Sequence, residues 1–177
     1  RHRRHRTPMT PMTTATTPLA DRFSPLDNPA IFDRFGEEPF FPETITLLRS
    51  VRDHDFDTLA DLCDDDFGIV DLDVDGSGVP IRSRAEWEDW FRGLFAKLDA
   101  AGAETDSIIT DYAATRTPYL GFGVLEWVQT LSMGPLEARF TCMATLVWKR
   151  TETGWKEARW HASLLSADIP PEMAAAA

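Results

Sequence analysis

The chain has 177 residues, a usual length for one domain with a single hydrophobic core. Its 29 acidic residues outnumber its 18 basic residues, so the net charge is -11 and the chain repels nucleic acid phosphates and anionic membranes. No apolar run is long enough to span a membrane or to act as a secretory signal, and we therefore expect a soluble, cytoplasmic protein with no nucleic-acid and no membrane partner.

Residues 1–40 are expected to form a flexible arm. The first six residues are four arginines and two histidines, a basic tip that we expect to be disordered or foreign to the native protein. The rest of the arm is rich in Pro, Thr, Ser and Asp and has no sustained apolar period, so it cannot bury itself alone. Residues 28–35 do contain three large apolar side chains, and packing of residues 28–40 on the domain is an open alternative. At the other end, residues 167–177 are expected to be a disordered tail.

Three helices are expected in the first half of the domain, which spans residues 41–166. The first helix begins near Pro42, because proline is tolerated at the first helical position. Asp55 caps the second helix. The third helix has the clearest pattern, since Ser83 and Glu86 form a capping box. Six large apolar side chains follow at helical spacing: Trp87, Trp90, Phe91, Leu94, Phe95 and Leu98.

The sequence pattern changes from helical spacing to alternation after Gly102. Before that point, residues 67–70 and 79–81 flank a glycine-rich turn and predict a short hairpin between the second and third helices. Long strands are then expected at residues 104–114, 120–133, 137–150 and 155–165. Helices followed by long antiparallel strands indicate an α+β fold in which the helices cover one face of a curved antiparallel sheet.

The last predicted hairpin indicates which of its residues share a face. If residues 152–154 form a three-residue loop, Thr151 pairs with Trp155. The inner face then collects Phe140, Cys142, Ala144, Leu146 and Trp148 with Ala158, Trp160, Ala162 and Leu164. The outer face takes the alternate residues of the last strand: Glu157, Arg159, His161 and Ser163. A shift of one residue would mix polar and apolar side chains on both faces, so the pattern favours this register.

The order of elements resembles the nuclear transport factor 2-like superfamily, and within it the SnoaL-like and the calcium/calmodulin-dependent kinase association domains. Residues 124–131 are similar to the third strand of the family, and residues 145–150 with 154–163 are similar to its closing hairpin. In the closing strand Trp155, His161 and Ser163 fit the family pattern, whereas Arg159 replaces a histidine: WKEARWHAS. The resemblance implies a cone-shaped fold with three N-terminal helices packed on a curved antiparallel sheet.

The resemblance leaves the activity open, because the superfamily includes isomerases, dehydratases, polyketide cyclases, binding proteins and oligomerisation hubs. We expect a SnoaL-like homodimer that binds a small apolar molecule in the pocket between helices and sheet. One alternative is a cofactor-independent isomerase, dehydratase or polyketide-cyclase-type enzyme that uses acid/base chemistry. The other is an oligomerisation hub. No cofactor is expected in any of the three cases.

Four residues are candidates for proton transfer or for hydrogen bonding to a substrate. His161 is the only histidine in the predicted sheet, and its side chain can take and give a proton near neutral pH, although its predicted face favours an interface role. Asp71 could reach the pocket mouth, as carboxylates of this region do in some isomerases of the superfamily. Tyr112 is a candidate hydrogen-bond donor in a strand, and Glu126 is a candidate general base with no motif behind it.

Four aromatic side chains are candidates for binding a ligand in the pocket, with ordinary core packing as the alternative: Trp87, Phe91, Trp127 and Trp160. Residues 71–76 resemble the opening of a calcium-binding loop, but Arg82 stands where a bidentate glutamate is required, so no metal site is expected. Cys63 and Cys142 are expected to be buried free thiols. The sequence contains no motif for a nucleotide, a nicotinamide cofactor or a serine nucleophile.

Overall fold

The computed structural model describes residues 23–73 and 76–174, so the basic tip of the chain lies outside the described residues. Its helices are η2 (Pro25–Asp27), α1 (Ala30–Phe35), α2 (Phe41–Arg52), α3 (Phe56–Leu62), α4 (Arg84–Ala101) and α5 (Pro171–Ala174). Its strands are β1 (Cys63–Leu72), β2 (Gly78–Ile81), β3 (Ala103–Arg116), β4 (Leu120–Met133), β5 (Leu136–Thr151) and β6 (Gly154–Asp168). No helix in the described ranges is long and apolar enough to cross a membrane.

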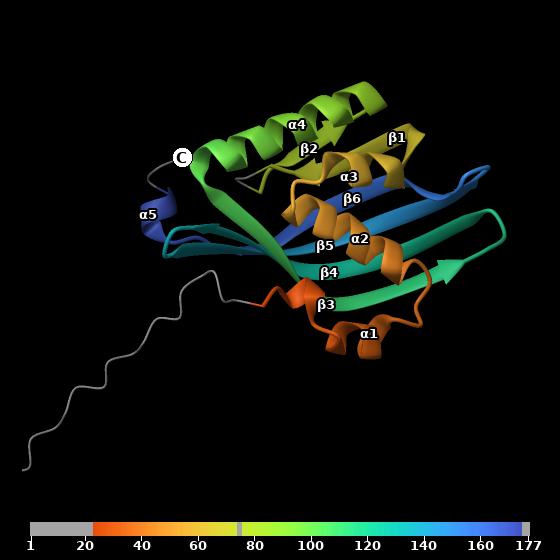
Figure 1. Ribbon diagram of the computed structural model, residues 1–177, viewed down its shortest axis with the longest axis horizontal. Coiled ribbons are helices and arrows are strands. Elements are labelled where there is room, and N and C mark those ends of the chain that lie inside the picture. Colours follow the sequence, from red (N-terminus) through yellow and green to blue (C-terminus); the bar gives the residue numbers. More distant parts are fainter. Residues whose placement is uncertain (1–22, 74–75, 175–177) are drawn as a thin grey trace, which may run out of the picture.

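The strands form one sheet in the order β2-β1-β6-β5-β4-β3, and Figure 1 shows α2, α3 and α4 on the same face of this curved sheet. The predicted α+β architecture is therefore confirmed. Every neighbouring pair is antiparallel except β1 and β6, which run in parallel. The sheet is mixed rather than wholly antiparallel, because the β1–β2 hairpin attaches beside the last strand of the chain instead of beside the next one.

The capping box predicted for α4 is present. The Ser83 side chain accepts a hydrogen bond from the Glu86 N–H at 3.2 Å, and the Glu86 carboxylate accepts one from the Arg82 N–H at 2.8 Å. The helix ends at Gly102, whose φ of 59° places it in the left-handed region that glycine adopts without strain. The buried side of α4 carries Trp87 and Phe91, which therefore face the sheet.

The loop of the β5–β6 hairpin differs from the prediction. Thr151 pairs with Gly154, so the loop has two residues instead of three. A β-bulge between Val147 and Trp148 then restores the predicted pairing from Val147, opposite Arg159, to Cys142, where a second register shift follows. Between loop and bulge the pairing is shifted, and Glu157 lies opposite Trp148. The placement of Glu157 on the outer face was therefore wrong, and its side chain is buried inside.

The described part of the N-terminal segment packs against the domain. Leu26 is fully buried, and the ring of Phe40 stacks on Trp148 at a centroid distance of 5.5 Å. Phe40 also occupies the space over Gly121, where an added Cβ would lie only 2.0 Å from its ring. Ordered structure thus begins well before residue 41. At the other end it extends beyond residue 166, since β6 continues to Asp168 and α5 follows.

Candidate functional site

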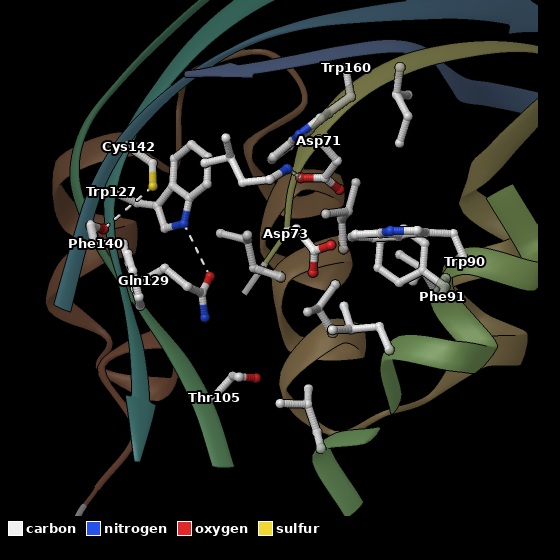
Figure 2. A pocket seen from close by; sticks show the side chains of 18 of the residues that line it. Asp71, Asp73, Trp90, Phe91, Thr105, Trp127, Gln129, Phe140, Cys142 and Trp160 are labelled. Carbon is white, nitrogen blue, oxygen red and sulfur yellow. Dashed lines mark hydrogen bonds between the residues drawn. The ribbon is translucent and has the colours of Figure 1, made fainter. Parts of the chain in front are cut away.

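A cavity of about 140 Å³ lies between the helices and the inner face of the sheet (Figure 2). Most of its wall is aliphatic or aromatic, from α2, α4 and all parts of the sheet except the β2 edge: Leu47, Leu48, Val51, Ile69, Trp87, Trp90, Phe91, Leu94, Leu98, Trp127, Leu131, Phe140 and Trp160 among others. The polar side chains in this wall are few, and they determine what chemistry the cavity can support.

All four aromatic residues predicted for the pocket wall lie at this cavity. Trp87 and Phe91 come from successive turns of α4, with ring centroids 5.1 Å apart. Trp127 and Trp160 come from β4 and β6, and their rings meet edge to face at 5.5 Å. Their contact with a ligand stays a prediction. Helical spacing brings side chains to one face of a helix, and alternation brings them to one face of a strand, so these two patterns in the sequence placed the four residues on the inner side.

Asp71 lies near the end of β1, and its carboxyl group faces the cavity beside Trp160 (Figure 2). The residue is half-buried, yet protein surrounds the carboxyl group itself, and burial raises its pKa to about 6. The Leu72 N–H, which donates to Asp71 Oδ1 at 2.8 Å, and the Trp160 indole oppose this rise. At neutral pH Asp71 is therefore mostly ionised but takes up a proton readily, as a general base must.

Glu157 is a further carboxyl group at the cavity, besides Asp71 and Asp73, and sequence reasoning missed it. Only 3% of the residue is exposed, and its Oε2 lies 3.5 Å from the Cys63 Sγ. Burial, together with the nearby negative charge of Asp71, raises the pKa of Glu157 to about 8. The group is therefore mostly protonated and uncharged at neutral pH. A two-residue hairpin loop would have indicated its position, but loop length could not be read from the sequence.

The other polar groups of the wall divide into those with partners and those without. The Gln129 side-chain oxygen accepts hydrogen bonds from Ser107 Oγ at 3.0 Å and Trp127 Nε1 at 3.2 Å, and its amide nitrogen donates to the Asp106 carbonyl at 2.8 Å. By contrast, Trp160 Nε1 and Thr105 Oγ1 make no hydrogen bond of good geometry with described residues. The Trp160 indole lies beside the Asp71 carboxyl group and lowers its pKa, so of these two groups only Thr105 Oγ1 has no polar neighbour described above.

His161 and Tyr112 do not line the cavity. His161 is exposed on the outer face of the sheet, between Val70 of β1 and Thr145 of β5. Tyr112 is buried, but its hydroxyl donates to the Pro39 carbonyl at 2.8 Å and thereby fixes the N-terminal segment. Glu126 is also outside, because its neighbours in β4 on either side point inward. None of these side chains has the access that proton transfer in the cavity requires.

Replacing Tyr112 by phenylalanine is expected to lower the free energy of unfolding by about 1 to 2 kcal/mol, since the Pro39 carbonyl loses its donor. Ligand binding in the cavity is expected to be unchanged. Urea unfolding followed by tryptophan fluorescence measures the first quantity, and ligand titration of the same variant measures the second. A loss of ligand binding with unchanged stability would instead assign Tyr112 to the site.

The described residues of the calcium-like segment contribute two carboxyl groups to the cavity. Asp71 and Asp73 line the cavity, while residues 74–75 lie outside the described part of the chain. In the described ranges no group of three or more His, Cys, Asp and Glu side chains could hold a metal ion. Cys63 and Cys142 are free and buried as predicted, and burial raises the pKa of Cys142 to about 11, so its thiol is a weak nucleophile.

Comparison with solved structures supports the fold. A provisionally named dehydratase of the NTF2-like family from Streptomyces avermitilis is 20% identical with a TM-score of 0.60, over 76% of this chain and 98% of that one. A provisionally named scytalone dehydratase from Novosphingobium aromaticivorans is 8% identical with a TM-score of 0.61, over 80% and 89%. A provisionally named calcium/calmodulin-dependent protein kinase type II association domain from Thiobacillus denitrificans is 20% identical with a TM-score of 0.55, over 73% and 96%.

Comparison with protein families gives the more specific result. No curated protein matches the chain. The model of the SnoaL-like domain, however, matches residues 46–167, which is well over half of the chain and includes every wall of the cavity. The chain therefore belongs to the SnoaL-like domain family.

Proposed function

We propose that this protein is an enzyme that moves a proton on a small, neutral, largely apolar molecule held in the cavity, without a cofactor. The observation that carries the proposal is the presence of two carboxyl groups with raised pKa values, about 6 for Asp71 and about 8 for Glu157, in one mostly apolar cavity that Asp73 also lines. Environments that separate the pKa values of two acids in one site are typical of acid/base catalysis.

The size of the cavity limits the ligand to roughly one ring. An apolar cavity of about 150 Å³ in another protein accommodates benzene, and this cavity measures about 140 Å³. The aromatic faces of Trp87, Phe91 and Trp127 suit a flat ligand. A ligand with a carboxylate would meet the charge of Asp71 in a poorly solvated space, so a neutral ligand is favoured.

A cyclic ketone with a nearby double bond is the simplest substrate for this arrangement. Asp71 removes a proton from the carbon next to the carbonyl group, the C–H electron pair forms a new C=C bond, and the carbonyl oxygen gains the negative charge. Trp160 Nε1, which lies beside Asp71 without a hydrogen bond of good geometry, would donate a hydrogen bond to that oxygen. Return of the proton from Asp71 to the far carbon of the double bond gives the conjugated ketone and restores the carboxylate.

The comparisons support this proposal only in part. Two of the similar structures are provisionally named dehydratases, and removal of a proton next to a carbonyl group begins both isomerisation of unsaturated ketones and loss of water from hydroxyketones. With identities of 20% and 8%, these matches show the fold alone. The choice of reaction therefore depends on the cavity.

Conversion of the unconjugated isomer of cyclohexenone to its conjugated isomer tests the proposal. We expect the protein to accelerate the rise in ultraviolet absorbance that accompanies product formation. In deuterium oxide the product is expected to contain less than one equivalent of solvent deuterium, because in some turnovers Asp71 returns the same proton that it removed. The His161→Ala variant, altered on the outer face, serves as the control and is expected to match the wild type. If ligand-observed NMR shows the probe bound but the rate equals that in buffer, the cavity only binds.

The predicted homodimer also stays a proposal. Large apolar side chains are exposed on the outer face of β4 and in the loop before it: Tyr119, Leu120, Phe122 and Val124. Phe122 is 53% exposed, which is unfavourable for a large aromatic ring unless another surface covers it. This row of side chains supports pairing of two copies through the outer face, away from the cavity.

A further inference from the structure

Glu157 reaches the cavity because of an irregularity in the sheet. In a regular hairpin with the pairing seen beyond Val147, Glu157 would share the outer face with Arg159 and His161. The bulge places Trp148 opposite Glu157, so both side chains lie on the inner face. Bulges are found preferentially next to functional sites, where they redirect a side chain. Here the redirected side chain is an acid in a nearly apolar wall.

The inward position of the Glu157 carboxyl group lowers the stability of the fold unless a strong hydrogen-bond partner or a ligand compensates for its burial. Burial of a polar group without hydrogen bonds is unfavourable. Among the described residues its hydrogen-bond partner is the Cys63 thiol at 3.5 Å, which is a weak donor, and its Oε1 makes no hydrogen bond with any of them. No basic side chain pairs with Glu157 in the described ranges, although Lys156 is adjacent in sequence, because the Lys156 ammonium binds Asp61 instead.

The groups that face Glu157 favour its uncharged form. Cys63 at the start of β1 and Asp71 near its end face Glu157 from the neighbouring strand, and the Asp71 charge adds to the effect of burial in raising the Glu157 pKa. Trp148 lies opposite on β5 and contributes an uncharged side chain. Arg84 lies behind Cys63 and donates to the Cys63 carbonyl at 3.0 Å. Glu157 Oε1, which has no hydrogen-bond partner among the described residues, therefore belongs to a protonated carboxyl group of a residue that lines the cavity.

We infer that Glu157 donates a hydrogen bond to an acceptor oxygen of the ligand, and that the cavity thereby selects neutral carbonyl compounds. The inference rests on the proposed function and adds the substrate class and the second residue. Asp71 and Glu157 then have different tasks, since the ionised group takes the proton while the uncharged group stabilises the oxygen that becomes negative. Anionic ligands lack this advantage, because they meet Asp71 and no Lys, Arg or His lies among the described residues of the wall.

Binding of three one-ring probes tests this inference. The probes are cyclohexanone, methylenecyclohexane, which has nearly the same shape but no oxygen, and cyclohexanecarboxylate. The proteins are the wild type, Glu157→Gln, which keeps an uncharged donor, and Glu157→Met, which has no donor. Affinities are measured near pH 6.5 by fluorescence of the cavity tryptophans and by ligand-observed NMR, and circular dichroism compares the folding of all three proteins.

We expect Glu157→Gln to bind cyclohexanone within about threefold of the wild type and Glu157→Met to bind it about tenfold more weakly, which is the effect of one neutral hydrogen bond. Methylenecyclohexane is expected to bind all three proteins alike, and cyclohexanecarboxylate to bind none of them. In the wild type, cyclohexanone affinity is expected to fall as the pH rises through about 8, where Glu157 ionises, and in Glu157→Gln it is expected to stay level.

Several results would overturn the inference. Equal losses of cyclohexanone binding in Glu157→Gln and Glu157→Met would contradict a donor role, and so would a wild-type affinity that does not change with pH. The wild-type pH profile keeps the test valid even if a variant is poorly folded. The outcome is also separable from the proposed reaction. If probe binding depends on Glu157 but no isomerisation occurs, the inference is supported and the proposed reaction is contradicted. If isomerisation occurs but probe binding does not depend on Glu157, the proposed reaction is supported and the inference is contradicted.

Discussion

Replacement of Asp71 by asparagine is expected to slow isomerisation of the unconjugated cyclohexenone at least about a hundredfold, the usual contribution of a positioned general base. Asparagine has nearly the same shape but cannot accept the proton, so cyclohexanone binding is expected to change little. In the wild type the rate is expected to rise as the pH passes through about 6, where Asp71 ionises, and to fall above about 8, where Glu157 loses its proton. Initial rates across this pH range measure both effects.

The matched control for this variant is Asp66→Asn. Asp66 lies on the same strand, but it is exposed outside the cavity and pairs with Arg159 at 3.5 Å. The same chemical change at this position is expected to leave the rate unaltered. If both Asp71→Asn and Asp66→Asn isomerise the substrate at the wild-type rate, Asp71 is not the base, and the reaction assigned to the cavity is wrong.

The sequence was sufficient to predict most of the fold, because local signals agreed with one another. The Ser83 capping box, the apolar spacing of α4 and the alternation after Gly102 each specify structure over a few residues, and together they require helices on one face of a long-stranded sheet. The position of β1 was less predictable. Its parallel pairing with β6 joins segments about ninety residues apart, and no local pattern encodes such a contact.

The candidate site was predictable in its apolar walls and only partly in its chemistry. Trp87, Phe91, Trp127 and Trp160 followed from spacing alone, and Asp71 followed from the resemblance to the superfamily. Glu157 was missed because a single bulge reverses the direction of a side chain, and the energetic difference between a two-residue and a three-residue loop is too small for composition to reveal. His161 was a candidate because its imidazole can take and give a proton, but the predicted β5–β6 register already placed it on the outer face.

The free energy of unfolding is expected to decrease as the pH rises from about 5 to about 8, on account of Glu157. Its pKa is about 8 in the folded protein, against an ordinary value of 4.5, so over this range the folded state binds more protons than the unfolded state. Stability must then fall with rising pH. At about 1.4 kcal/mol per pKa unit, the expected loss is on the order of 3 kcal/mol. Asp71, with a smaller shift in the same direction, adds a lesser loss at lower pH.

Comparison with Glu157→Gln isolates this contribution from the other titrating groups. Asp53 and Asp55 have lowered pKa values, through hydrogen bonds from Arg52 and Thr58 respectively, and they destabilise the fold only under acidic conditions. The wild type and Glu157→Gln both contain Asp53 and Asp55, so the effects of these two residues cancel when the two stability profiles are subtracted. Urea unfolding at several pH values is expected to give a wild-type stability that declines toward pH 8 and a flatter profile for the variant. Parallel profiles would mean that Glu157 is ionised throughout, and an ionised Glu157 could not donate a hydrogen bond to a carbonyl oxygen.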